Sequence, residues 1–132
     1  MRDKNILDTN IIYVQNHILN TGFYELKKSK FYCYIFKMEK FEDLDLFKEF
    51  MKKEYKDARH IIVAARFENK EVANEDREVG SSAKKILFAM QKRNDQNMAV
   101  LIARRFGGTL LGVGGVEKSF LQSYSNALNG LK

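Results

Sequence analysis

The order of sequence patterns predicts an α+β fold, in which a four-stranded or larger, mostly antiparallel sheet carries helices packed on one face. Apolar and β-branched segments dominate the first third of the chain, and segments with helical periodicity then alternate with further apolar runs. The 132 residues have the length of one domain, and a hydrophobic content of 45% is sufficient for a core. We therefore expect residues 1–132 to form a single domain.

Strands are expected early in the chain. Residues 1–10 show no clean periodicity and are expected to lie loosely on the surface. Residues 11–14, IIYV, predict a short strand because they are β-branched or aromatic. The turn formers at residues 20–22 predict a reversal into a strand over residues 23–28. Residues 30–38 predict another strand, which carries apolar side chains on both parities and is expected to be covered on both faces.

Helices and strands are expected to alternate after residue 40. Residues 41–55 predict a helix, because apolar side chains recur at the spacing of one helical face, namely Leu44, Phe47, Met51 and Tyr55. Residues 60–67 are apolar and β-branched and predict a core strand. Residues 68–78 are charged and predict a loop or an irregular hairpin.

The last third of the chain predicts a helix, a strand and a second helix. Ser81 or Ser82 can cap a helix over residues 83–93. A turn over residues 94–97 then leads to an apolar strand from Met98. A final helix is expected from near Gly115 to about residue 128.

Charge and cysteine content narrow the class of protein. The formal net charge of +6 favours polyanionic partners such as nucleic acid, although lysine-rich surfaces also serve solubility. The single cysteine, Cys33, excludes an internal disulfide and fits a reducing cytoplasm. No apolar run approaches the roughly 20 residues of a membrane span, so no membrane partner is expected.

Motifs for cofactor or metal chemistry do not occur in the sequence. The glycine-rich segment fits neither G-x-G-x-x-G nor a Walker loop, so we expect neither a dinucleotide nor a nucleoside triphosphate. His17, His60 and Cys33 lack the spacing of metal ligands, and no catalytic residue, metal or cofactor is assigned. His60, at the start of an apolar strand, is typical of a core or edge histidine bonded to a backbone group.

Anion binding is the chemistry that the sequence favours most. Arg104 and Arg105 end a core strand, where alternation points them to opposite faces, and backbone N–H groups after Gly114 offer a nest for an anion. Alternatively, the glycines only let the chain turn, and Arg104 is a structural ion-pair partner of Glu78. The candidate binding residues are His60, Glu78, Lys84, Lys85, Arg104, Arg105, Gly107, Gly108, Gly112, Gly114, Gly115 and Lys118.

Several motifs resemble the YigZ/IMPACT family. Residues 104–116, RRFGGTLLGVGGV, resemble the family signature R-Y-F-G-G-x-x-L-G-T-G-G-L. Residues 25–31, ELKKSKF, resemble E-x-K-K-S-R-F, and residues 58–60, ARH, resemble A-T/R-H. Residues 74–87 stand where the family has D-D-G-E-P-x-G-T-A-G-x-P-I-L, and they keep its acids while lacking its Gly and Pro.

Two further substitutions depart from the signature, since Arg105 replaces its Tyr and Val113 replaces its Thr. The resemblance implies a ribosomal-protein-S5-domain-2-like fold, in one IMPACT N-terminal-like domain without the ferredoxin-like second domain of bacterial relatives. It also implies a cytoplasmic protein linked to translation, because the eukaryotic relatives regulate translation by binding an activator of an initiation-factor kinase.

Three functions are open at this point. The leading hypothesis is a non-enzymatic module that contacts structured RNA or the ribosome through basic residues, namely Lys84, Lys85, Arg105 and Lys118. The second is a protein-interaction regulator of translation or stress response, which binds a regulatory protein through an exposed apolar patch. The third is a small-ligand enzyme, which requires His60, Glu78 and Arg104 to converge in one concave pocket.

Overall fold

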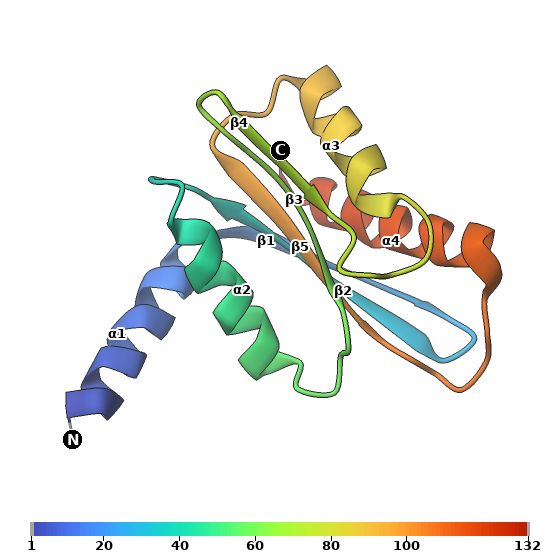
Figure 1. Ribbon diagram of the computed structural model, residues 1–132, viewed down its shortest axis with the longest axis horizontal. Coiled ribbons are helices and arrows are strands. Elements are labelled where there is room, and N and C mark those ends of the chain that lie inside the picture. The colour runs from blue at the N-terminus through green and yellow to red at the C-terminus, as the bar shows by residue number, and fades with distance from the viewer. Residues whose placement is uncertain (1, 132) are drawn as a thin grey trace.

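A five-stranded sheet organises the chain and carries four helices (Figure 1). The structure is a computed structural model that describes residues 2–131, with side chains from residue 9 onward. Its elements in chain order are α1 (Arg2–Asn16), β1 (Ile18–Leu26), β2 (Ser29–Lys37), α2 (Asp43–Glu54), β3 (Ile61–Phe67), β4 (Lys70–Asn74), α3 (Ser82–Arg93), β5 (Met98–Arg105) and α4 (Gly112–Leu128).

The sheet has the strand order β1-β2-β5-β3-β4, and every neighbouring pair is antiparallel. The last strand in the sequence, β5, therefore lies at the centre between β2 and β3. Its register sets Arg104 opposite Phe31 on β2 and Ala103 opposite Ile61 on β3. The C-terminal end of β5 and the N-terminal end of β3 consequently lie side by side at the same end of the strands. The predicted α+β class and antiparallel sheet are confirmed.

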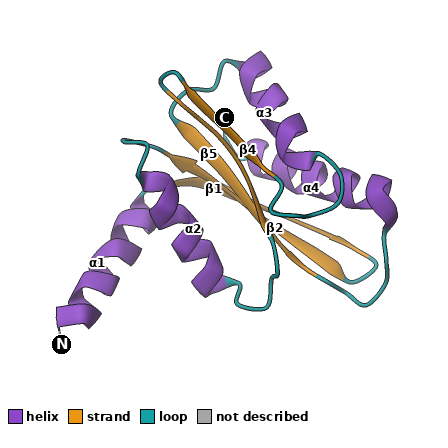
Figure 2. Cartoon of the chain, viewed as in Figure 1, coloured by secondary structure: helices purple, strands orange, loops and turns teal. Residues whose placement is uncertain are grey.

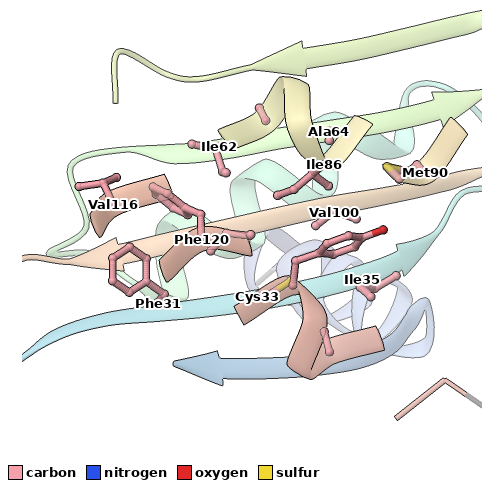
Figure 3. Packing of buried hydrophobic residues seen from close by; sticks show 14 residues of the cluster. Phe31, Cys33, Ile35, Ile62, Ala64, Ile86, Met90, Val100, Val116 and Phe120 are labelled. Atoms are coloured by element: carbon pink, nitrogen blue, oxygen red, sulfur yellow. The ribbon is translucent and has the colours of Figure 1, made fainter. Parts of the chain in front are cut away.

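Helices cover both faces of the sheet, so the prediction of helices on one face only is wrong (Figure 2). On one face, α3 and α4 enclose a core that includes Phe31, Cys33 and Phe120, as Figure 3 shows. On the other face, α1 and α2 enclose a core that includes Phe36 and Phe47. The physical reason is the apolar character of β2 and β5 on both parities, which requires two helical layers to keep water away.

The N-terminal segment is helical rather than loose or extended. Residues 11–14 lie in α1, so the predicted strand is wrong; residues 2–10 are also helical, and residue 1 lies outside the described residues. Val14 is buried in the α2-side core, and the Tyr13 hydroxyl donates a hydrogen bond of 2.9 Å to the Asp43 carboxylate. Docking on α2 outweighs the local β-propensity of Ile and Val here.

The first hairpin turns later than the sequence predicts. Residues 20–22 lie inside β1, and the chain instead reverses at Lys27 and Lys28, whose φ angles of +47° and +69° are typical of a type I′ turn. Gly22 has a different role, because a Cβ at this position would overlap the backbone of Ser123 and Ala127 in α4. The glycine therefore allows α4 to pack directly on β1.

The remaining predicted elements agree with the structure to within a few residues. The predicted helices over 41–55 and 83–93 correspond to α2 and α3, and the strands over 60–67 and from Met98 correspond to β3 and β5. Residues 68–78 include β4, which forms a hairpin with β3. The last helix begins at Gly112 rather than near Gly115. None of the described helices is both long enough and apolar enough to cross a membrane.

Alanine substitutions at Gly22, which packs against α4, and at Gly114, in the first turn of α4, should have opposite effects on stability. We expect Gly22→Ala to lower the free energy of unfolding by about 2 kcal/mol or more, because backbone rather than a flexible side chain occupies the space. Gly114→Ala, in the first turn of α4 with open space around it, should raise it by up to about 1 kcal/mol. Urea unfolding followed by circular dichroism measures both, and equal effects would contradict this packing.

Candidate functional site

A cleft of about 430 Å³ opens where the end of β5, the start of β3 and the loop before α3 meet. Its lining, which we call the arginine cleft, consists of Arg59, Arg77, Arg104, His60, Asp57, Glu78, Val79, Phe106 and Leu110. The floor is formed by the less exposed side chains of Arg104, His60 and Glu78, and the other six form the rim. The volume suits a small ligand or a single nucleotide.

Arg104 is held in the floor by an ion pair and two aromatic rings. Its Nη1 donates to the Glu78 carboxylate at 3.1 Å, which is the ion pair that the structural alternative for Arg104 named. Both side chains are nearly enclosed, with 12% of Arg104 and 8% of Glu78 exposed. The guanidinium lies 5.8 Å from the ring centre of Phe31 and 5.7 Å from that of Phe106. These contacts fix the plane of the guanidinium.

His60 lies just before β3 and lacks the backbone hydrogen bond that we expected for it. Its side chain is 26% exposed, and its Nδ1 is buried with no hydrogen-bond partner in the described part of the chain. The nearest carboxylate oxygen, on Asp76, is 4.0 Å away, beyond hydrogen-bond distance. That oxygen instead accepts the Ile61 N–H at 2.7 Å. His60 therefore keeps unused hydrogen-bonding capacity at the cleft.

The loop from residue 75 to residue 78 turns tightly at the rim. The Glu78 N–H donates to the Glu75 carbonyl at 2.9 Å, and Asp76 and Arg77 have φ angles of +50° and +65°, as in a type I′ turn. Arg77 occupies the place of the glycine in the D-D-G-E-P motif that this loop resembles. A non-glycine residue in the left-handed region costs about 1–2 kcal/mol, so the turn that presents Arg77 to the cleft is strained.

Two glutamates that the sequence analysis missed anchor this loop. Glu75 accepts the N–H groups of Ala83 and Lys84 at 2.9 and 3.0 Å and so caps α3, whereas neither Ser81 nor Ser82 does. Glu117, on α4, accepts the Ser81 N–H at 2.6 Å and the Lys85 ammonium at 2.6 Å. The Lys85 and Ser81 hydrogen bonds lower the pKa of Glu117. These contacts span up to 36 positions, and no sequence pattern signals them.

Arg105 points to the opposite face from Arg104, as strand alternation predicted. It donates to Asp57 at 2.8 Å and to the Tyr32 hydroxyl at 3.3 Å, and it lies over the rings of Tyr32 and Tyr55. The hydrogen bond from Arg105 lowers the pKa of Asp57. Arg105 is thus engaged on the α2 side of the sheet.

The basic residues that the sequence grouped into one surface lie on two different faces of the sheet. Lys84 and Lys85 lie on α3 and Lys118 on α4, which cover the face opposite to Arg105. Lys85 is further engaged by Glu117. The structure therefore separates Arg105 from the three lysines, because successive residues of a strand face opposite ways.

The glycines of the signature have mainly structural roles. Gly107 donates its N–H to the Ser29 hydroxyl at 3.1 Å, and the backbone of Lys28 leaves no room for a Cβ there. Gly108 and Gly112 adopt left-handed φ angles of +94° and +74°. Because α4 begins at Gly112, its free N–H groups come before Gly115 and not after Gly114, and no side chain caps them.

The described part of the chain contains neither a cluster of metal ligands nor an exposed thiol. No group of three or more His, Cys, Asp or Glu side chains is placed to hold a metal ion among the described residues. Cys33 is fully buried, and this burial raises the pKa of its thiol. The arginine cleft is therefore the candidate binding site.

Three sequence-predicted residues, His60, Glu78 and Arg104, come together in the cleft floor. The rim arginines were not among the candidates from the sequence, although Arg59 is the neighbour of His60 and Arg77 the neighbour of Glu78. Adjacency to candidate residues was thus a usable signal for both arginines.

The sequence profile of the Impact N-terminal domain matches residues 27–128 of this chain. The chain belongs to the Impact N-terminal domain family. It is 28% identical over 108 residues to the IMPACT family member YvyE of Bacillus subtilis, across 79% of this chain and 50% of YvyE. It is 30% identical over 111 residues to an IMPACT family member of Haemophilus influenzae, across 79% of this chain and 53% of the relative.

A solved structure supports the same fold. The crystal structure of a hypothetical protein superposes with a TM-score of 0.76 at 27% identity, across 83% of this chain and 56% of that protein. The chain spans about half the length of the curated relatives that it matches.

Replacing the strained rim arginine should stabilise the fold. We expect Arg77→Gly to raise the free energy of unfolding by about 1 kcal/mol, because glycine adopts the left-handed region without steric cost. The control is Arg59→Gly, a rim position without a positive φ, which should not gain stability. Urea unfolding measures both variants, and a less stable Arg77→Gly would show that the turn is not strained.

The Glu117 contacts should make stability depend on pH in the acid range. The folded-state pKa of Glu117 is lowered from 4.5, so its stabilising contribution is present above pH 4.5 and is lost as pH falls through the folded-state value. Glu117→Gln should therefore lower the thermal midpoint at pH 7 and much less at pH 3. The exposed Glu68→Gln serves as control, and a pH-independent difference for Glu117→Gln would contradict the assignment.

Proposed function

We propose that this chain is a non-enzymatic RNA-binding module linked to translation, that it works in the cytoplasm, and that it takes RNA or a ribosomal surface at the arginine cleft. The observation that carries the proposal is the convergence of three arginines on one cleft with an exposed aromatic side chain at its rim. The proposed contact surface therefore differs from the lysine surface expected from the sequence.

The charge of the cleft favours an anionic ligand. Both of its carboxylates are already paired, Glu78 with Arg104 and Asp57 with Arg105. Arg59 and Arg77 are exposed, and neither has an ion-pair partner among the described residues. Two uncompensated guanidinium groups therefore remain at the rim of a protein with a net charge of +6. Such groups attract phosphates, and their binding releases the counterions that surround a nucleic acid.

The apolar part of the rim favours an unpaired base. Phe106 is 59% exposed although it is aromatic, and it lies beside the Arg104 guanidinium. A base stacked on an aromatic side chain contributes about 1–3 kcal/mol, and arginines beside the ring hold the neighbouring phosphates. Because the cleft has the volume of about one nucleotide, it suits a loop or an end of RNA better than a duplex.

Family membership supports the link to translation. The chain belongs to the Impact N-terminal domain family. The resemblance described in the sequence implies eukaryotic relatives that regulate translation. The expected likeness to a ribosomal protein domain points the same way, although a fold by itself does not specify function.

A small-ligand enzyme is the second candidate, because His60, Glu78 and Arg104 do converge in one concave site. The ion pair argues for binding over catalysis, since Arg104 holds the Glu78 carboxylate at 3.1 Å and keeps it from acting as a free base. Incubation of the protein with RNA oligonucleotides and mononucleotides, followed by chromatography, should show no product. A product lost in Glu78→Gln would favour the enzyme.

A protein-interaction regulator is the third candidate. Val79, Phe106 and Leu110 expose apolar surface around the rim, and such surface also suits a protein partner. Affinity purification with and without nuclease separates the two, because a protein partner survives nuclease treatment and an RNA-mediated one does not.

Loss of the two free rim arginines should weaken RNA binding and flatten its salt dependence. We expect Arg59→Ala with Arg77→Ala to reduce affinity for a single-stranded RNA about tenfold or more, and to reduce the slope of log K against log salt by about 1–2. The matched control is Lys37→Ala with Lys40→Ala, which removes the same charge. Lys37 is the last residue of β2, whereas Arg104 of the cleft pairs with the beginning of that strand. Fluorescence anisotropy measures both; equal losses would overturn the cleft as the contact.

A further inference from the structure

Two buried polar atoms of the cleft floor lack a hydrogen-bond partner. Among the described residues, the unpartnered buried side-chain atoms are His60 Nδ1, Arg104 Nε, Ser82 Oγ and the Tyr124 hydroxyl oxygen. The first two belong to side chains that line the cleft. Leaving such a group unpaired costs about 1–3 kcal/mol, so a ligand oxygen that reaches either buried atom would remove that cost.

Arg104 presents the geometry that recognises two oxygens on one centre. Glu78 takes Nη1 at 3.1 Å, which leaves the side of the guanidinium formed by Nε and Nη2. The rings of Phe31 and Phe106 and the Glu78 contact hold the guanidinium plane in place. Two parallel N–H groups in a fixed plane match a phosphate or carboxylate in bidentate fashion.

His60 adds a second donor at the same floor. Its Nδ1 donates in one neutral tautomer and in the protonated form, so it can meet a third oxygen of the ligand. Two carboxylates face these groups, namely Glu78, which Arg104 neutralises, and Asp76, whose nearer oxygen is engaged by the Ile61 N–H. The charge of Glu78 is therefore compensated by Arg104, whereas Asp76 keeps its negative charge and is only hydrogen-bonded.

We propose that the cleft floor binds a phosphate monoester through Arg104 and His60, with the group supplied by the phosphorylated end of an RNA strand or by a free mononucleotide. This deepens the proposed function and rests on it for RNA as the carrier of the phosphate. In the bound state, Arg104 Nε and Nη2 hold two phosphate oxygens and His60 Nδ1 donates to the third. Arg59 and Arg77 at the rim contact the following phosphate.

The depth of the two residues selects a terminal phosphate over an internal one. Arg104 is only 12% exposed, so a phosphate must enter the cleft to reach it. An internal phosphodiester would have to bring two sugars into a volume of about 430 Å³, whereas a monoester enters on a single link. The monoester also carries more negative charge, which raises its preference for the arginine fork.

The test compares RNA ends on one short single-stranded sequence. Three oligonucleotides are used, with a 5′-phosphate, with a 3′-phosphate, and with hydroxyls at both ends. Fluorescence anisotropy should give about tenfold tighter binding for a phosphorylated end than for the hydroxyl control. Competition by adenosine monophosphate and by inorganic phosphate then separates a nucleotide from a strand end as the source of the monoester.

Variants locate the recognition in the floor. Arg104→Lys keeps a charge for Glu78 but removes the fork, and it should abolish the preference for the phosphorylated end while leaving the hydroxyl RNA bound. His60→Leu should reduce the preference, and His60→Asn, which restores a donor near the Nδ1 position, should recover part of it. The matched control is Arg66→Lys, since Arg66 pairs with Glu71 at the far end of β3.

The possible results separate this inference from the proposed function. Equal binding of all three oligonucleotides, with Arg59 and Arg77 still required, overturns the monoester site and leaves RNA binding intact. Binding of adenosine monophosphate or inorganic phosphate without RNA binding supports the monoester site and overturns the RNA function. Binding of none overturns both. Should Arg104→Lys fail to fold, the comparison of RNA ends on the wild-type protein decides the question.

Discussion

Burial of β5 on both faces is the constraint on which the rest of the molecule depends. Its residues 99–103 are apolar without interruption, so a helical layer is needed above and below the sheet. The strand ends in Arg104 and Arg105, which strand alternation sends to opposite layers. One arginine consequently forms the floor of a cleft, and the other closes against Asp57 and two tyrosines. One hydrophobic strand thus fixes the core and places the site at its end.

The cleft combines groups that favour stability with groups that oppose it. The Arg104–Glu78 pair is nearly enclosed, and burying two charges is tolerable because they meet at 3.1 Å. The left-handed Arg77 and the unpartnered atoms of His60 and Arg104 work against folding. Glu75 and Glu117 hold the loop in spite of this cost, through hydrogen bonds to α3 and to Ser81. Strain held in place by surrounding contacts is typical of a binding site.

The residues of the cleft floor were candidates from the sequence, whereas the arginines of its rim were not. His60, Glu78 and Arg104 were candidates on residue type and position, and the expected Arg104–Glu78 pair is present. The lysines expected to widen the basic surface lie on the face opposite to Arg105, whereas Arg59 and Arg77 line the cleft. Residue chemistry is local information, whereas the face on which a side chain lies depends on register and on the packing of other elements.

The sequence alone determined the elements with strong hydrophobic periodicity, namely α2, α3, β2, β3 and β5, and the motifs that indicate the family. These follow from side-chain spacing within a few residues, which the chain carries locally. Only the tertiary structure decided that residues 11–14 are helical, that helices cover both faces, and that a cleft exists. Those outcomes depend on distant contacts such as the one between Tyr13 and Asp43, which are 30 positions apart, and contacts at that separation leave no periodic trace in the sequence.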